Sequence, residues 1–171
     1  MKHNLITLTI DHKTVEVPEG TTILAAAKSV GISIPTLCYL NLSDFGCVNT
    51  PSSCRMCLVE VEGRRNLAPA CVTSAADKMV VSTNSVRALK TRKTMLELLL
   101  SDHPKDCLTC QKSGNCELQS LADKFSIRDI KLKGEQSAYR LDISKSLIRD
   151  MDKCIMCRRC ETMCNEVQTV G

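Results

Sequence analysis

The spacing of the cysteines constrains this chain more than any other feature of its sequence. Twelve of its 171 residues are cysteines, and a chain this rich in thiols is either cross-linked by disulfides or loaded with metal. Eleven of them, with one histidine, form three sets along the chain. The first set is Cys38, Cys54, Cys57 and Cys71; the central set is His103, Cys107, Cys110 and Cys116; the third set is Cys154, Cys157, Cys160 and Cys164. Three sets predict three separate sites.

The start of the chain favours metal over disulfides. Residues 1–11 contain neither an apolar core of seven or more residues nor a small-residue cleavage site, so we expect no signal peptide. We therefore expect a cytoplasmic protein, in which thiols stay reduced and clustered cysteines hold metal. No stretch approaches eighteen apolar residues, so the sequence predicts no membrane span.

The charge distribution says little about partners. The net charge is +4, and the densest basic run is Arg87, Lys90, Arg92 and Lys93. This run predicts a solvated helix face, and the alternative is a docking surface for an acidic partner. We expect no nucleic acid partner, because two Tyr, two Phe and no Trp leave almost no aromatic rings for bases to stack on.

The pattern of residues 1–82 predicts a mixed sheet with one helix packed across it. Residues 4–17 alternate as a hairpin with its turn at Asp11-His12. A helix over residues 23–30 is predicted from Thr21 or Thr22 as its cap and from Gly31 as its end. Two further strands are predicted over residues 58–62 and 79–82.

The period changes near Ser85, where a longer helix is predicted. Its apolar face is expected to carry Val86, Leu89, Leu96 and Leu99. Pro104 should end this helix near His103. A second helix is predicted over residues 116–125, a charged linker over 131–136 and an extended segment over 139–143.

The first set resembles a known family. I-P-T-L-C-Y around Cys38, S-C-R-M-C-L-V-E-V-E-G around Cys54 and Cys57, and L-A-P-A-C around Cys71 resemble the 2Fe–2S ferredoxin domain. The form is that of the complex I large iron–sulfur subunit and of FeFe-hydrogenase catalytic subunits. The resemblance implies an α+β chain whose residues 1–82 form a β-grasp domain with one 2Fe–2S cluster. Cys47 lies in a loop that is longer than usual, and it could replace Cys38 as a ligand.

The central set has the spacing His-x3-Cys-x2-Cys-x5-Cys. This spacing resembles the histidine-ligated 4Fe–4S site of the same two families, and it implies a small helical 4Fe–4S domain over residues 83–130. Zinc also accepts three cysteines and one histidine, so a zinc site is the alternative. A neutral imidazole in place of a thiolate removes one negative charge, which should favour the reduced cluster.

The third set has the spacing Cys-x2-Cys-x2-Cys-x3-Cys of bacterial ferredoxins. It implies a partial ferredoxin-like segment over residues 138–171 that holds a second 4Fe–4S cluster. Asn165 stands where that family has proline, and no second run of cysteines follows. Either Cys164 completes this cluster, or a ligand comes from a partner subunit or a longer parent chain.

These resemblances imply a relay for electrons. The seven glycines form neither G-x-G-x-x-G nor a P-loop, so no nucleotide cradle is predicted. No Ser-His-Asp or metal-hydrolase motif is present either, so no catalytic residue is predicted. We expect a non-catalytic iron–sulfur subunit of a cytoplasmic, flavin-dependent, electron-bifurcating NAD(P)/ferredoxin oxidoreductase of the transhydrogenase type. The expected partners are flavin- and NAD(P)-binding subunits and ferredoxin.

Two alternatives remain open. The first is an N-terminal electron-relay fragment of a bifurcating FeFe-hydrogenase or formate dehydrogenase. The second belongs to another class, a zinc-binding structural module, which would be colourless.

Overall fold

The computed structural model describes residues 4–47, 49, 52–132 and 141–170. The chain forms two compact units of mixed helix and strand. Unit 1 comprises Met1–Arg92 and Arg158–Gly171, and unit 2 comprises Lys93–Cys157.

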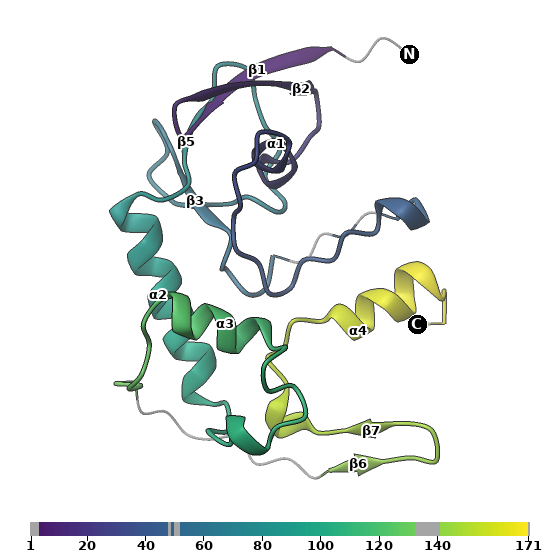
Figure 1. Cartoon of the computed structure of the whole chain (residues 1–171). Helices are drawn as coiled ribbons and strands as arrows, with labels where there is room; N and C mark the ends of the chain where they lie inside the picture. Colours follow the sequence, from purple (N-terminus) through teal and green to yellow (C-terminus); the bar gives the residue numbers. More distant parts are fainter. Residues whose placement is uncertain (1–3, 48, 50–51, 133–140, 171) are drawn as a thin grey trace. The chain divides into compact units, whose positions relative to one another are not determined.

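Unit 1 is built on a sheet of five strands, drawn in Figure 1. The strands are β1 (Leu5–Ile10), β2 (Lys13–Pro18), β3 (Leu58–Val61), β4 (Ala68–Pro69) and β5 (Val80–Ser82). Their order across the sheet is β2-β1-β5-β3-β4. Strand β1 runs antiparallel to β2 and parallel to β5, and β3 runs antiparallel to both β4 and β5.

The predicted hairpin of residues 4–17 is confirmed. Its turn residues Asp11 and His12 have φ angles of 45° and 68°, as the tight turn of a twisted two-residue hairpin requires. The alternation of the sequence is seen in the burial of β2, where Val15 and Val17 are buried between exposed neighbours.

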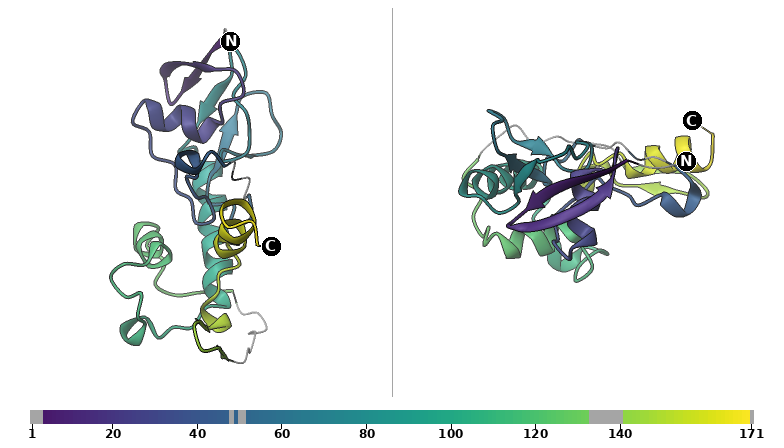
Figure 2. Two further views of the ribbon diagram at one scale, coloured as in Figure 1. Left: turned by 90° about the vertical axis from the view of Figure 1, so that its right-hand side faces the viewer. Right: turned by 90° about the horizontal axis from the view of Figure 1, so that it is seen from above.

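Helix α1 (Ile23–Ser29) begins where the sequence predicted and ends one residue before the predicted end, with Val30 as its C-cap. The Thr22 hydroxyl oxygen accepts a hydrogen bond of 3.2 Å from the Ala25 amide, which satisfies one of the free N–H groups of the first turn. Gly31 has a φ of 74° and lets the chain turn back, so that the Ile32 amide donates to Ala27 O at 2.9 Å. Figure 2 shows α1 beside the strands of this sheet.

The core of unit 1 is aliphatic and contains two of the thiols. The buried face of α1 joins residues of all five strands around a centre that includes Leu8, Ile10, Val59 and Val81. The same cluster of buried residues includes Cys57 and Cys71. Cys57 and Cys71 of the first set are therefore part of the core rather than attached to its surface.

Helix α2 (Val86–Ser101) confirms the predicted helix. Of its predicted apolar face, Leu96 is buried, but Val86 and Leu89 are not. Val86 is 83% exposed and Leu89 is 39% exposed. The fully buried positions are instead Ala88, Arg92 and Leu96, which recur every fourth residue. The prediction was wrong at Val86 and Leu89 because it counted Arg92 as a polar, exposed position.

Unit 2 contains the end of α2 and several short elements. These are the 3-10 turn Cys107–Thr109, α3 (Glu117–Lys124), the antiparallel pair β6 (Asp142–Ile143) and β7 (Ile148–Arg149), and the 3-10 turn Met151–Lys153. Helix α3 confirms the second predicted helix. Residues 133–140 of the predicted linker and extended segment lie outside the described residues. The last described elements of unit 1 are α4 (Arg159–Thr162) and one π-helical turn, Met163–Val167.

Candidate metal centres

The four thiols of the first set lie in pairs inside unit 1. Cys57 Sγ lies 3.3 Å from Cys71 Sγ, and the thiol of Cys54 is hydrogen-bonded to that of Cys38. All four residues are buried, with at most 8% of their surface exposed. The fold therefore brings these residues together from three separate stretches of chain.

Strand pairing explains how Cys57 and Cys71 meet. Leu58 pairs with Pro69 across β3 and β4, and the Ala70 amide donates to the Cys57 carbonyl at 3.1 Å. Cys57 directly precedes one strand and Cys71 closely follows the other, so the antiparallel register places them opposite each other.

Backbone amides surround the sulfur atoms of this set. The Leu37 amide donates to Cys54 Sγ at 3.4 Å. Amides of Ser53 and Ser52 donate to the sulfurs of Cys38 and Cys71. Hydrogen bonds of this kind stabilise thiolates and, in iron–sulfur proteins, help to set the reduction potential.

Two left-handed residues make this arrangement possible. Ser52 and Arg55 have φ angles of 44° and 56°, which is uncommon for residues with a side chain and costs free energy. Met156 and Arg158, between cysteines of the third set, share the feature with φ of 51° and 58°. This strain could not be predicted from the sequence, because none of the four positions is a glycine or asparagine.

The electrostatics of the two pairs are alike. The hydrogen bond from Cys54 lowers the pKa of Cys38 to about 5, and the same bond together with burial raises the pKa of Cys54. The hydrogen bond with Cys71 and burial raise the pKa of Cys57, while that bond lowers the pKa of Cys71. In each pair the hydrogen bond between the two thiols thus favours the thiolate at one sulfur, Cys38 or Cys71, and the protonated thiol at the other.

This donor set fits a two-iron group better than a single ion. Among the described residues, no group of three or more His, Cys, Asp or Glu side chains is placed so that it could hold a metal ion. Zinc in a structural site takes four ligands around one centre. A 2Fe–2S cluster takes two thiolates on each of two irons, and two pairs of thiols are what unit 1 provides.

The central set lies in unit 2, where His103 follows the end of α2. The His103 amide donates to Leu100 O at 3.3 Å. Its Nδ1 atom is buried and has no hydrogen-bond partner among the described residues, which is rare for a buried polar atom. Burial lowers the pKa of His103, as does Lys153, against the attraction of Asp106 and Asp150. Burial thus favours the neutral form of the imidazole, which is the form that binds a metal.

The thiols of the central set lie on the loop between α2 and α3. Cys107 starts the 3-10 turn Cys107–Thr109, Cys110 ends it, and Cys116 caps α3. These side chains are more exposed than those of the first set: Cys107 is exposed and the other two are half-buried. Among the described residues these four groups do not form a site for one metal ion. A 4Fe–4S cluster spreads its ligands over four irons.

The third set falls on both sides of the division between the units. Cys154 and Cys157 belong to unit 2, whereas Cys160 and Cys164 belong to unit 1. Cys157 is half-buried and the other three are exposed. Their grouping around one cluster stays a prediction from the sequence.

Cys47 lies apart from the thiol pairs of the first set. Its Sγ donates to Glu166 O at 3.1 Å and to Phe45 O at 3.4 Å. Because Cys54 is paired with Cys38, this geometry favours Cys38 over Cys47 as the ligand.

Arg92 does not belong to a solvated basic run, as its sequence context predicted. It is 1% exposed, and its Nε and Nη2 atoms donate to Leu58 O at 3.0 and 2.6 Å. Burial lowers the pKa of Arg92, against the attraction of Cys57 and Asp11. The sequence did contain a signal for this burial, because Arg92 lies four residues from both Ala88 and Leu96 and therefore on the same face of the helix.

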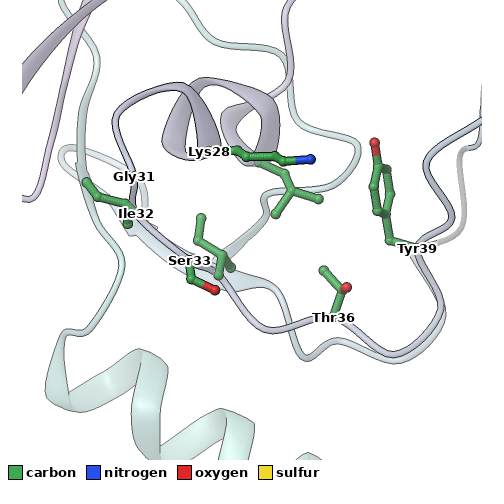
Figure 3. A pocket seen from close by; sticks show the side chains of 8 residues that line it. Lys28, Gly31, Ile32, Ser33, Thr36 and Tyr39 are labelled. Carbon is green, nitrogen blue, oxygen red and sulfur yellow. The ribbon is translucent and has the colours of Figure 1, made fainter. Parts of the chain in front are cut away.

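A pocket of 380 Å³ opens beside the loop that carries Cys38. Its apolar wall comes from α1 and the segment after it, and polar groups come from Lys28, Ser33, Thr36 and Tyr39. Figure 3 shows the Lys28 side chain extending from the end of α1 towards Tyr39. The pocket is a second feature that the sequence did not indicate.

Two family matches divide the first three quarters of the chain. Residues 3–86 match the 2Fe-2S iron-sulfur cluster binding domain, and residues 92–131 match the NADH-ubiquinone oxidoreductase-G iron-sulfur binding region. No helix in the described part of the chain is long and apolar enough to cross a membrane.

Similar proteins come from hydrogenases and from NADH-quinone oxidoreductases. The NADP-reducing hydrogenase subunit HndD of Solidesulfovibrio fructosivorans is 66% identical over 98% of this chain and 29% of its own length. A G-type subunit of the NADH-quinone oxidoreductase of Rhizobium meliloti is 43% identical over 95% of this chain and 19% of its own length. A crystal structure of NAD+-reducing NiFe-hydrogenase in the H2-reduced state superposes with a TM-score of 0.80 at 32% identity, covering 91% of this chain and 64% of that one.

The chain thus spans less than a third of the curated relatives it matches. What it shares with them is the part that carries the 2Fe–2S domain and the 4Fe–4S binding region. The chain therefore carries the iron–sulfur region that is common to G-type subunits of NADH-quinone oxidoreductase and to the hydrogenase subunit HndD.

Proposed function

We propose that this chain is an electron relay with three iron–sulfur clusters. Cys38, Cys54, Cys57 and Cys71 would hold a 2Fe–2S cluster in a β-grasp ferredoxin domain over residues 1–82. His103, Cys107, Cys110 and Cys116 would hold a 4Fe–4S cluster over 83–130, and Cys154, Cys157, Cys160 and Cys164 a second one over 138–171. The single observation that carries the proposal is the burial of four thiols as two pairs inside unit 1.

The chain's own residues prepare the first site for a charged group. Amides of Leu37, Ser52 and Ser53 point at its sulfur atoms, and the core excludes water around them. The iron–sulfur groups supply one-electron chemistry when bound. The protein's contribution is to hold them, to set their potential through charge and hydrogen bonds, and to keep oxidants away.

The partners that fit this role are subunits that carry flavin and NAD(P), and ferredoxin. The support is that relatives are named as NADP-reducing hydrogenase and NADH-quinone oxidoreductase subunits, together with the absence of a nucleotide-binding motif in this sequence. Within that group we propose a cytoplasmic electron-bifurcating complex of the transhydrogenase type.

A second candidate is an N-terminal relay segment of a longer hydrogenase. It is favoured by the lengths of the relatives, of which this chain spans 29% and 19%. The mass of the native polypeptide and the identity of the proteins that co-purify with it distinguish the two candidates.

The proposed function is tested by the metal content of the protein purified without oxygen. We expect about ten irons per chain, from one two-iron and two four-iron groups, with visible absorption and the paramagnetic signals of reduced clusters. Stoichiometric zinc in a colourless protein, or only about two irons, would contradict the proposal.

A matched pair of cysteine variants tests the assignment of the first set. Cys57→Ala should lose the 2Fe–2S signal while the 4Fe–4S signals remain, because it removes one of two thiolates on one iron. Cys47→Ala is the control, since this thiol only donates to two carbonyl groups. Loss of the 2Fe–2S signal in Cys47→Ala with retention in Cys57→Ala would overturn the assignment.

A further inference from the structure

The Arg92 side chain places a positive charge in the core, and some other group must offset the free-energy cost of burying it. It is the largest fully buried side chain of the described residues, and its two hydrogen bonds go to a single carbonyl oxygen, Leu58 O. Within the described part of the chain no carboxylate forms an ion pair with it. An arginine removed from water without an opposite charge is strongly destabilising, so a nearby anion must offset its burial.

Two groups attract the guanidinium from a distance, and one of them is already engaged. The Asp11 carboxylate accepts a hydrogen bond from the Thr83 amide at 2.7 Å and another from the Thr83 hydroxyl. The other group is the Cys57 sulfur, which attracts the guanidinium when it is a thiolate. Cys57 directly precedes Leu58, so the carbonyl that holds Arg92 belongs to the strand that begins at the thiol.

The first set becomes much more negative than Asp11 when it holds its cluster. Binding of iron removes the remaining protons from the thiols, and the resulting group carries net negative charge that grows by one on reduction. A fixed cation at this place therefore attracts the reduced state more than the oxidised state. The core around it has a low dielectric constant, which makes the difference larger than at the surface.

We propose that Arg92 is the buried counter-cation of the 2Fe–2S group and that its charge raises the reduction potential of that group. The inference rests on the proposed ligation by Cys38, Cys54, Cys57 and Cys71. Arg92 does not touch the reacting atoms; it is a positioning residue that acts through the strand after Cys57 and through its charge. The hydrogen bonds to Leu58 O fix where that charge lies.

The test compares three variants by redox titration of the anaerobically purified full chain. Arg92→Met removes the charge and keeps the length of the side chain. Arg92→Lys keeps the charge without the two-pronged hydrogen bond. Arg87→Met is the control, because Arg87 lies on the same helix but is exposed and pairs with Glu60 at 3.9 Å.

We expect Arg92→Met to lower the ratio of reduced to oxidised 2Fe–2S centre at least tenfold at the wild-type midpoint, which is about 59 mV for a one-electron couple. The shift should persist from about 0.1 M to about 1 M salt, because a buried charge is poorly screened. Arg92→Lys should keep a potential close to that of the wild type. Any shift in Arg87→Met should be smaller and should vanish at high salt.

The outcomes separate charge from packing. An Arg92→Met protein that keeps its cluster and its wild-type potential overturns the inference. If Arg92→Met loses the cluster, the result in Arg92→Lys decides. Retention of the cluster and of its potential in Arg92→Lys supports the role of the charge. Loss of the cluster in both variants assigns Arg92 to packing alone and overturns the inference. A wild-type protein without a 2Fe–2S spectrum shows instead that the proposed ligation is wrong, which separates the two failures.

Discussion

Among single residues, His103 offers a substitution that should change the net charge of the 4Fe–4S cluster proposed for the central set. Its Nδ1 atom is buried without a hydrogen-bond partner among the described residues, and burial lowers its pKa. A neutral imidazole ligand contributes no charge, whereas a thiolate at the same place contributes one negative charge. The difference should be visible in the potential of the central cluster.

We expect His103→Cys to retain a 4Fe–4S centre that is harder to reduce, because the added thiolate stabilises the oxidised state. His103→Ala should leave one iron without a protein ligand and lose the cluster. Redox titration followed by electron paramagnetic resonance measures both effects.

The control for this pair is His12→Asn, in the hairpin turn. His12 has a φ of 68°, which asparagine tolerates, and it belongs to no cysteine set. Potentials that stay at the wild-type value in His103→Cys would show that His103 is not a ligand and serves only at the end of α2.

At the scale of elements, helix α1 depends on its N-terminal cap. Thr22→Ala should lower the free energy of unfolding of unit 1 by about 1 kcal/mol, because the Ala25 amide loses its acceptor. Thr22→Ser keeps the hydroxyl and should lose much less. Chemical denaturation of the iron-loaded protein compares the two, and equal losses would mean that packing of the threonine methyl group, not the cap, stabilises the helix.

The same elements show what the sequence could and could not predict. The alternation of residues 4–17 and the Thr22 and Gly31 signals were sufficient for the hairpin and α1, because local backbone preferences decide those structures. Strand β4, Ala68–Pro69, was missed, since two residues carry no periodicity and the pairing with β3 is set by distant contacts. The sequence also did not predict which thiols of the first set lie together. Spacing indicates the members of a set, but the pairing of their sulfur atoms depends on contacts between residues that are distant in sequence.

At the scale of the whole chain, cluster binding and folding of unit 1 should be coupled. The core contains Cys57 and Cys71 among its buried residues, and few aromatic side chains are present to fill space if the iron is lost. Removal of iron by a chelator should therefore lower the midpoint of thermal unfolding and increase amide exchange in β3 and β4. Exchange in β1 and β2, away from the thiols in sequence, is the internal reference.

An unchanged unfolding midpoint after complete removal of iron would show that the aliphatic core is sufficient on its own. In that case unit 1 would fold without its clusters, and the cysteines would matter for electron transfer but not for stability.

The parallel pairing of β1 with β5 has a consequence for how the protein is made. Thr9 pairs with Val80 and Ile10 with Val81, so the sheet cannot close until the ribosome has delivered all four cysteines of the first set. Contacts between residues so distant in sequence form late, because closing a long loop costs entropy before any contact repays it. We therefore expect a period during synthesis in which these thiols are still open to a protein that delivers iron and sulfide, and β5 then closes the sheet behind the finished cluster.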